Sequence, residues 1–140
     1  MNRPLVFALL VAAGTGAAAQ QQGMEPGEWE LTTTVSSPMM PQPQTMTVKH
    51  CIKAEDLADP SRWMGGTPPG SDCTLTPGER DARGATWQMA CPSQGLEGKG
   101  RARFNEGMLD SEMQMRGMQD GKKFELSTRT RGRRLGPCRS

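Results

Sequence analysis

The chain has 140 residues, of which 17 are Lys or Arg, 15 are Asp or Glu and four are Cys. A net charge of only +2 excludes a general binder of polyanions such as nucleic acid. The length fits one domain, and only 12 Leu, Ile, Val and Phe residues follow position 19, which excludes an aliphatic core of ordinary size.

The N-terminus has the pattern of a secretory signal peptide. Arg3 supplies a positive charge, residues 5–13 are apolar, and small residues end at Ala19. The apolar run is shorter than the roughly 20 residues that a membrane-spanning helix needs, so a cleaved leader is favoured over an anchor. We therefore expect residues 1–19 to be removed and residues 20–140 to form a single exported domain.

Two stretches in the first half alternate between polar and apolar side chains. Residues 27–35 and 44–52 both follow this period of two, which predicts half-buried strands. Three prolines within residues 38–43 predict a loop between them, because proline lacks the backbone donor of a strand. Residues 54–58 are typical of one short helical turn, and glycine and proline predict a loop at residues 65–70.

A hairpin is predicted in the middle of the chain. Residues 74–76 and 86–90 have the composition of two strands, with Pro77 and Gly78 expected in the turn region between them and residues 80–84 at its exposed tip. Cys73 directly precedes the first of these strands, and Cys91 directly follows the second. The arrangement suggests that a disulfide closes it.

The second half has the pattern of a β meander. Alternating runs at residues 99–104, 108–115 and 122–130 are separated by turn sequences at 105–107 and 119–121. The side chains predicted to point inward are Ala102, Phe104, Leu109, Met113, Met115, Phe124 and Leu126. With about seven strands, we expect a mainly β protein with an antiparallel meander. It would form a curled sheet, an open barrel or a small sandwich, with one short helix and two disulfides.

The four cysteines are predicted to form disulfides. They lie at positions 51, 73, 91 and 138, and no Cys-x-x-Cys pair is present, so a metal knuckle is disfavoured in an exported protein. Cys73 and Cys91 bracket the hairpin, which leaves Cys51 to pair with Cys138. Chain-entropy estimates give roughly 3 kcal/mol for the shorter loop and 4 to 5 kcal/mol for the longer one.

No catalytic constellation is apparent in the sequence. His50 is the only histidine, there is no Gly-x-Ser-x-Gly motif, and the cysteines are assigned to disulfides. Paired carboxylates such as Asp110 and Glu112 fall on the wet face of a predicted strand, away from any aromatic-walled cleft. We expect a protein that is not an enzyme and holds no cofactor.

The methionines offer a metal site as one interpretation. Thioethers select Cu(I), and Met113, Met115 and Met118 together with His50 could supply its ligands. The alternative is that Met113 and Met115, at inward positions of a strand, fill core volume in a leucine-poor protein.

Our leading hypothesis is a binding or interaction module for an apolar ligand or an envelope protein, monomeric and without affinity for nucleic acid. The residues expected on its ligand face are Trp29, Met46, Trp87, Phe104, Met113 and Phe124. The basic C-terminal strand, residues 122–130, could serve as a docking edge. The alternatives are the copper-binding protein above and an inhibitor or chaperone of an envelope enzyme that would act through exposed loops such as residues 65–70.

Several short motifs occur together in a recognisable order. They are Pro26-Gly27-Glu28-Trp29-Glu30, a cysteine before Ala54-Glu55-Asp56, two cysteines about twenty residues apart, and the terminal Leu135-Gly136-Pro137-Cys138. From about residue 23 to 138 the chain resembles the exported Gram-negative family catalogued as domain of unknown function 3617. The resemblance implies a small periplasmic β protein and brings no established activity, cofactor or catalytic residue.

Overall fold

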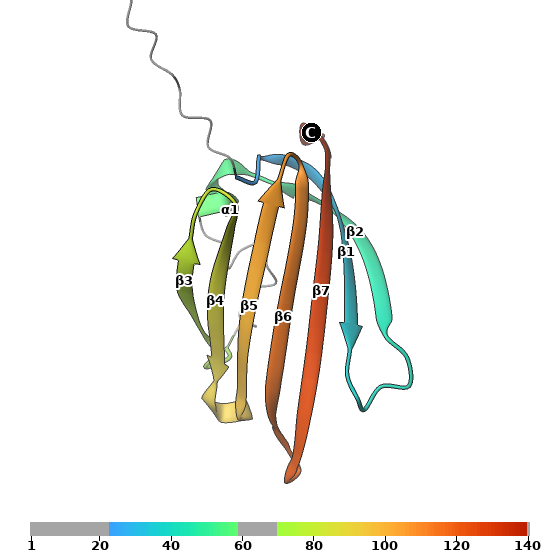
Figure 1. The fold of residues 1–140 in the computed structure, drawn as a ribbon, viewed down its shortest axis with the longest axis vertical. Coiled ribbons are helices and arrows are strands. Elements are labelled where there is room, and N and C mark those ends of the chain that lie inside the picture. The colour runs from blue at the N-terminus through green and yellow to red at the C-terminus, as the bar shows by residue number, and fades with distance from the viewer. Residues whose placement is uncertain (1–22, 59–69, 140) are drawn as a thin grey trace, which may run out of the picture.

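Seven strands form one antiparallel sheet in the computed structural model, which describes residues 23–58 and 70–139 (Figure 1). The strands are β1 (Gly27–Ser36), β2 (Gln44–Ile52), β3 (Thr74–Arg80), β4 (Gly84–Cys91), β5 (Leu96–Asn105), β6 (Met108–Gln119) and β7 (Lys122–Gly136). A short helix, α1 (Ala54–Ala58), follows β2, and a 3-10 turn at Pro92–Gln94 joins β4 to β5. The predicted leader, residues 1–19, and most of the predicted loop 65–70 lie outside the described residues.

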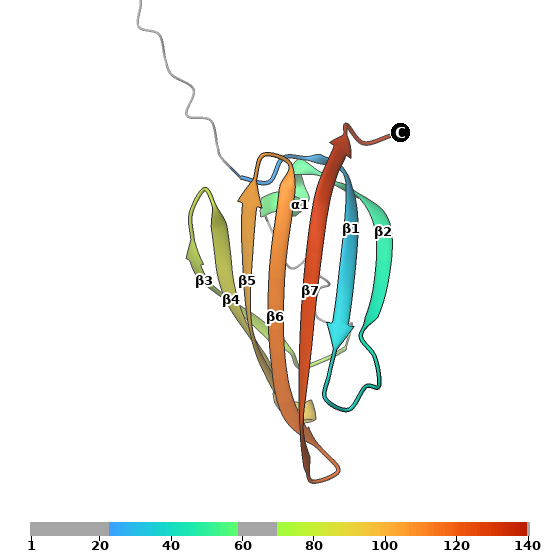
Figure 2. The same cartoon turned by 45° about the vertical axis from the view of Figure 1, so that its right-hand side comes forward.

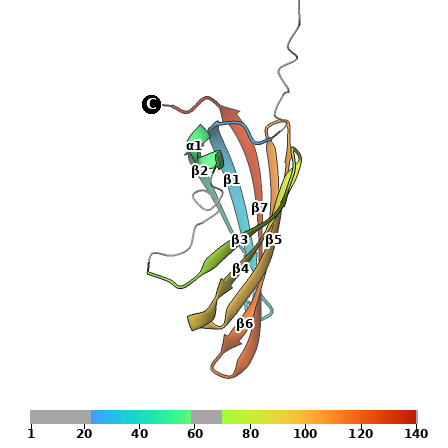
Figure 3. The same ribbon diagram turned by 90° about the vertical axis from the view of Figure 1, so that its left-hand side faces the viewer.

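The order across the sheet is β2-β1-β7-β6-β5-β4-β3. Strands β3 to β7 therefore form the predicted meander, and the hairpin of β1 and β2 pairs with the far side of β7. Because β2 and β3 lie at opposite edges of one sheet, the sheet is open. Of the three predicted architectures, the curled sheet is therefore the one that the structure has. Figures 2 and 3 show the curl, with α1 on the inner side near one end of the strands.

The predicted elements are confirmed, although the last three strands are longer than expected. β5 begins at Leu96, β6 extends to Gln119 and β7 extends to Gly136. Their ends carry glycine and arginine, which blur the polar–apolar alternation on which the prediction relied. Uninterrupted pairing of β6 with both neighbours maintains the strand geometry there.

The two predicted turns of the meander are confirmed by their backbone conformation. Glu106 and Gly107 have φ angles of 36° and 79°, and Asp120 and Gly121 have φ angles of 51° and 73°. Two successive positive φ angles are typical of the tight turns that match the twist of a hairpin.

The expected turn at Pro77 and Gly78 is wrong. Both residues lie within β3, and the pairing with β4 shifts register after Pro77. An edge strand tolerates proline because the donor that proline lacks can face away from the sheet. The exposed tip expected at residues 80–84 is confirmed, since β3 ends at Arg80 and β4 begins at Gly84. The side chain of Asp81 accepts hydrogen bonds there from the backbone N–H groups of Arg83 and Gly84, at 2.7 and 2.9 Å.

A small core lies at the end of the sheet near α1. Its buried members are Trp29, Leu31, Ile52, Trp87, Ala102 and Leu109, with Met24, Leu57, Leu75 and Phe104 packed against them. The indole N–H of Trp29 donates to the backbone carbonyl of Glu25 at 2.9 Å. The size of this core agrees with the scarcity of aliphatic residues.

Trp87 is accommodated by a glycine on the neighbouring strand. Gly100 is the cross-strand partner of Trp87 and is itself buried. A Cβ atom at position 100 would lie closer than 3.0 Å to three atoms of the indole ring. The missing side chain of Gly100 therefore provides the space in which the ring packs.

Both predicted disulfides are confirmed. Cys73 and Cys91 join β3 to β4 with a Cα–Cα distance of 4.0 Å, and Cys51 and Cys138 are 5.4 Å apart. The second bond spans 87 positions and ties the chain after β7 to the end of β2. Within the described parts of the chain, no helix has the length and hydrophobicity to cross a membrane.

Candidate functional site

The register of the sheet determines which side chains share a face. Directly paired residues of antiparallel strands point to the same side. We call the side that bears Trp29 and α1 the concave face, and the opposite side the convex face (Figure 3). All six predicted ligand residues lie on the concave face: Trp29, Met46, Trp87, Phe104, Met113 and Phe124.

These six residues do not form one site. Trp29 and Trp87 are buried in the core, and Phe104 packs against it, so their side chains are structural. Met46 lies on the edge strand β2 and is 63% exposed. Only Met113 and Phe124 remain as half-buried members of an accessible apolar surface.

That surface continues over residues that the sequence-based selection missed. We define the apolar trough as Met89, Leu96, Met113, Met115, Phe124 and Leu126, which are all half-buried and come from β4, β5, β6 and β7. Met89, Gly98, Met115 and Leu126 form one row across the sheet, and Leu96, Gly117 and Phe124 form the next. The alternation of the strands was the signal that could have identified the additional members.

Glycines place the methionines of the trough close to the sheet. A Cβ atom at Gly98 would lie 3.1 Å from Cγ of Met115 and 3.3 Å from Cε of Met113. The two flexible thioethers therefore lie over the bare backbone of β5. Such side chains adapt to ligands of varied shape.

The lining of the trough is apolar. No concave-face position of β1, β4, β5 or β6 carries a charged side chain, and on β7 the charged concave positions are Lys122, next to Phe124, and Arg134, at the far end of the strand. Thr33 and Thr130, whose hydroxyls are hydrogen-bonded at 2.9 Å, lie in the row that leads to Met46 on β2. The arrangement favours an occupant with a hydrocarbon body.

The four predicted copper ligands are not brought together. Met113 and Met115 lie on the concave face, whereas Met118 lies on the convex face. Across the sheet, Met113 is level with Val35 of β1, whereas His50 pairs with Trp29 of the same strand. Val35 and Trp29 are six residues apart, so Met113 and His50 are separated by roughly 20 Å along the strand direction. Among the residues that the structure describes, no group of three or more His, Cys, Asp or Glu side chains is placed to hold a metal.

The convex face is charged but largely compensated. Its ion pairs are Arg101 with Glu112 at 2.6 Å, Arg129 with Asp110 at 2.8 Å, Arg116 with Glu97 at 2.8 Å and Arg133 with Glu30 at 3.1 Å. Exposed pairs of this kind contribute roughly 0 to 1 kcal/mol each. The expected docking edge at residues 122–130 is divided by the pairing: its residues 127–130 pair with both β1 and β6, whereas residues 122–126 pair with β6 alone.

One carboxyl group on this face has a shifted pKa. The hydrogen bond from Arg129 lowers the pKa of Asp110 below its ordinary value, against partial desolvation that raises it. The nearby charges of Arg131 and Arg103 lower it further. The ionised form of Asp110 is therefore favoured by its bond to Arg129 and by two further arginines nearby.

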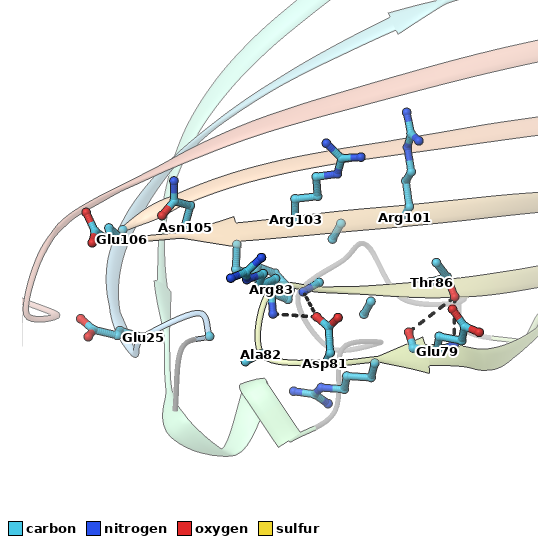
Figure 4. A pocket seen from close by; sticks show the side chains of 17 residues that line it. Glu25, Glu79, Asp81, Ala82, Arg83, Thr86, Arg101, Arg103, Asn105 and Glu106 are labelled. Carbon is cyan, nitrogen blue, oxygen red and sulfur yellow. Dashed lines mark hydrogen bonds between the residues drawn. The ribbon is translucent and has the colours of Figure 1, made fainter. Parts of the chain in front are cut away.

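A hollow of about 1330 Å³ lies beside the β3–β4 turn and the β5–β6 turn (Figure 4). Its charged residues are Arg80, Arg83, Arg101 and Arg103, and Glu25, Glu79, Asp81 and Glu106. Four positive and four negative charges balance, and Asp81 is engaged in the turn itself. This hollow does not select a charged ligand.

A second hollow, of about 530 Å³, lies on the convex face over β1, β7 and β6. The hydroxyls of Thr32 and Thr34 line it but already bond to Thr47 and Thr45. Of its two arginines, Arg129 is paired with Asp110, and its carboxylate Glu112 is paired with Arg101. Four of the side chains that line this groove are therefore already engaged within the protein.

Comparison with known proteins gives one match. A family model described as "Protein of unknown function (DUF3617)" matches residues 24–138. No curated protein and no solved structure matches the chain. The matched segment begins just before β1 and ends at the second disulfide, so it includes all seven strands.

Proposed function

The chain belongs to the DUF3617 family of proteins of unknown function, and we propose that it is a non-enzymatic periplasmic protein that binds an apolar ligand in the apolar trough. The observation that carries the proposal is a set of six half-buried apolar side chains on one face of an open sheet. Surfaces of this kind commonly mark binding sites in exported proteins.

The lining of the trough indicates the chemistry of the ligand. Five of its six side chains are methionine or leucine and the sixth is Phe124, which lies against Gly117, so the contacts are dispersive and adaptable. The concave positions of β4, β5 and β6 carry no charged side chain, and Lys122 of β7 lies on the same face beside Phe124, at one end of the trough. We therefore assign the ligand to the class of molecules with an acyl chain or a comparable hydrocarbon body.

A neutral apolar fluorophore, N-phenyl-1-naphthylamine, tests this proposal on the purified exported protein. Met113→Lys places a charge in the trough and should weaken binding at least tenfold. Met118→Lys is the matched control, because Met118 is on the same strand but on the convex face and 51% exposed. It should bind the probe as the parent does.

Two outcomes would contradict the proposal. One is equal probe affinity for the parent and both variants, when thermal melting shows that all are folded. The other is repeated failure of native mass spectrometry to find a lipid-sized adduct on protein purified from the periplasm.

The two alternative functions lack a supporting observation. The copper hypothesis needs Met118 and His50 near Met113 and Met115, and the register separates them. The inhibitor or chaperone hypothesis relied on residues 65–70, which lie outside the described residues except for Gly70.

A further inference from the structure

The two edges of the sheet are protected to different degrees. β3 has seven residues, contains Pro77 and is interrupted by a register shift, which are features that discourage pairing with another strand. β2 has nine residues, no proline and an unbroken register with β1. In residues 23–58 and 70–139, β2 pairs with β1 alone.

The free edge of β2 can be located to residues 44–50. Every one of these residues is exposed, whereas Cys51 beyond them is half-buried and bonded to Cys138. Met46 and Val48, neighbours on the concave face, are 63% and 49% exposed. Lys49 is the one charged side chain in this stretch, and charged side chains on an edge strand discourage pairing with another strand.

We propose that β2 is an interaction edge at which two copies of this chain pair as antiparallel strands, with Thr47 at the two-fold axis. In this register Met46 faces the partner's Val48, and Val48 faces the partner's Met46. Thr45 faces the partner's Lys49, and Gln44 faces the partner's His50. The two seven-stranded sheets would then continue into one another.

Self-complementarity favours a second copy over another partner. The two exposed apolar side chains match each other on the concave face, where cross-strand pairs at about 5 Å are stabilising. Lys49 meets a threonine rather than its own copy, so pairing brings no like charges together. An edge with one positive and no negative charge has little with which to select a charged peptide.

This inference does not depend on the proposed ligand. The paired edge uses Met46 and Val48, which belong to β2, whereas every member of the apolar trough comes from β4 to β7; Thr33 and Thr130 follow Met46 in its row, and Leu31 and Gly132 follow Val48. It differs from the monomer expected from the sequence, which did not show that β2 is an edge strand.

Cysteine cross-linking tests the register. Thr47→Cys places two thiols directly opposite each other, within the Cα separation that a disulfide needs. Thr45→Cys is the matched control: Thr45 and Thr47 point to the same face, are exposed, and bond to hydroxyls on β1 at 2.9 and 3.0 Å. Its two thiols would be roughly 13 Å apart. Thr47→Cys should give mostly covalent dimer on a non-reducing gel, and Thr45→Cys at least fivefold less.

Sedimentation velocity of the purified exported chain tests the association itself. The parent should be dimeric at roughly 100 µM, and Val48→Lys should be monomeric, because it places two charges in the apolar pair. Met108→Lys is the control, since Met108 is 52% exposed on the convex face of β6, and it should remain dimeric.

Peptide mapping should show that the two native disulfides are intact in each cysteine variant. A monomeric parent at this concentration would overturn the proposal. So would equal cross-linking of the two cysteine variants, a dimer that persists in Val48→Lys, or cross-linking of Thr47→Cys to a different polypeptide.

Discussion

Replacement of Gly100 by alanine should destabilise the protein by about 1 to 2 kcal/mol. The new Cβ atom would lie closer than 3.0 Å to three ring atoms of Trp87, so the indole must move by roughly 1 Å to regain ordinary contact distances. Trp87 is only 6% exposed and belongs to the core, where such overpacking costs roughly 1 to 3 kcal/mol. Alanine loses less backbone entropy than glycine when it folds into a strand, which offsets roughly 0.5 to 1 kcal/mol of this overpacking cost.

Urea unfolding followed by far-ultraviolet circular dichroism measures this change. Gly98→Ala is the matched control, because Gly98 is on the same strand and face but its new Cβ would be no closer than 3.0 Å to any atom: the backbone oxygen of Gln114 at 3.0 Å and the flexible side chains of Met115 and Met113 at 3.1 and 3.3 Å. It should stay within about 0.5 kcal/mol of the parent. A total stability of about 5 to 15 kcal/mol makes the effect at Gly100 easy to resolve.

A double-mutant cycle identifies the cause. In a Trp87→Leu background the ring is gone, so Gly100→Ala should cost less than about 0.5 kcal/mol. The reasoning is refuted if Gly100→Ala costs the same in both backgrounds, or if Gly98→Ala destabilises as much as Gly100→Ala in the parent.

Three further predictions concern other contacts. Replacing Cys51 and Cys138 by serine removes a bond that spans 87 positions and should lower the unfolding free energy by roughly 4 to 5 kcal/mol in a urea titration; a loss below about 1 kcal/mol would refute the entropic reasoning. Trp29→Phe removes the donor to a backbone carbonyl at 2.9 Å and should cost about 1 kcal/mol or more by the same titration, and an unchanged midpoint would argue against that bond. The hydrogen bond from Arg129 is the chief cause of the lowered pKa of Asp110 in the folded state. The ionised form of Asp110 therefore stabilises the fold above the unfolded pKa of about 3.9. This stabilisation is lost as the pH falls through the folded pKa. The stability difference between the parent and Asp110→Asn should therefore shrink in thermal melts between pH 6 and pH 2, and a constant difference would contradict this assignment.

Local sequence patterns were sufficient for most of the fold. The alternation in residues 27–35 and 44–52 located two strands, and Asp120-Gly121 located a turn, because side-chain period and backbone φ preferences are local properties. The pairing of Cys73 with Cys91 followed from the hairpin that they bracket. Pro77 misled the prediction because its tolerance depends on a strand being at the edge of the sheet.

The candidate site depended on information that no local pattern contains. Alternation placed Trp29, Met46 and Met113 on the same face, yet one is buried core, one is on a free edge and one is in the apolar trough. The burial of these three side chains differs because it depends on neighbouring strands that are distant in the sequence, such as β7 beside β1. Side-chain period and the spacing of the cysteines were enough to predict the strands, their faces and the disulfides. The strand order, the open edge at β2 and the position of the trough emerged with the folded sheet, because they depend on which strands pair.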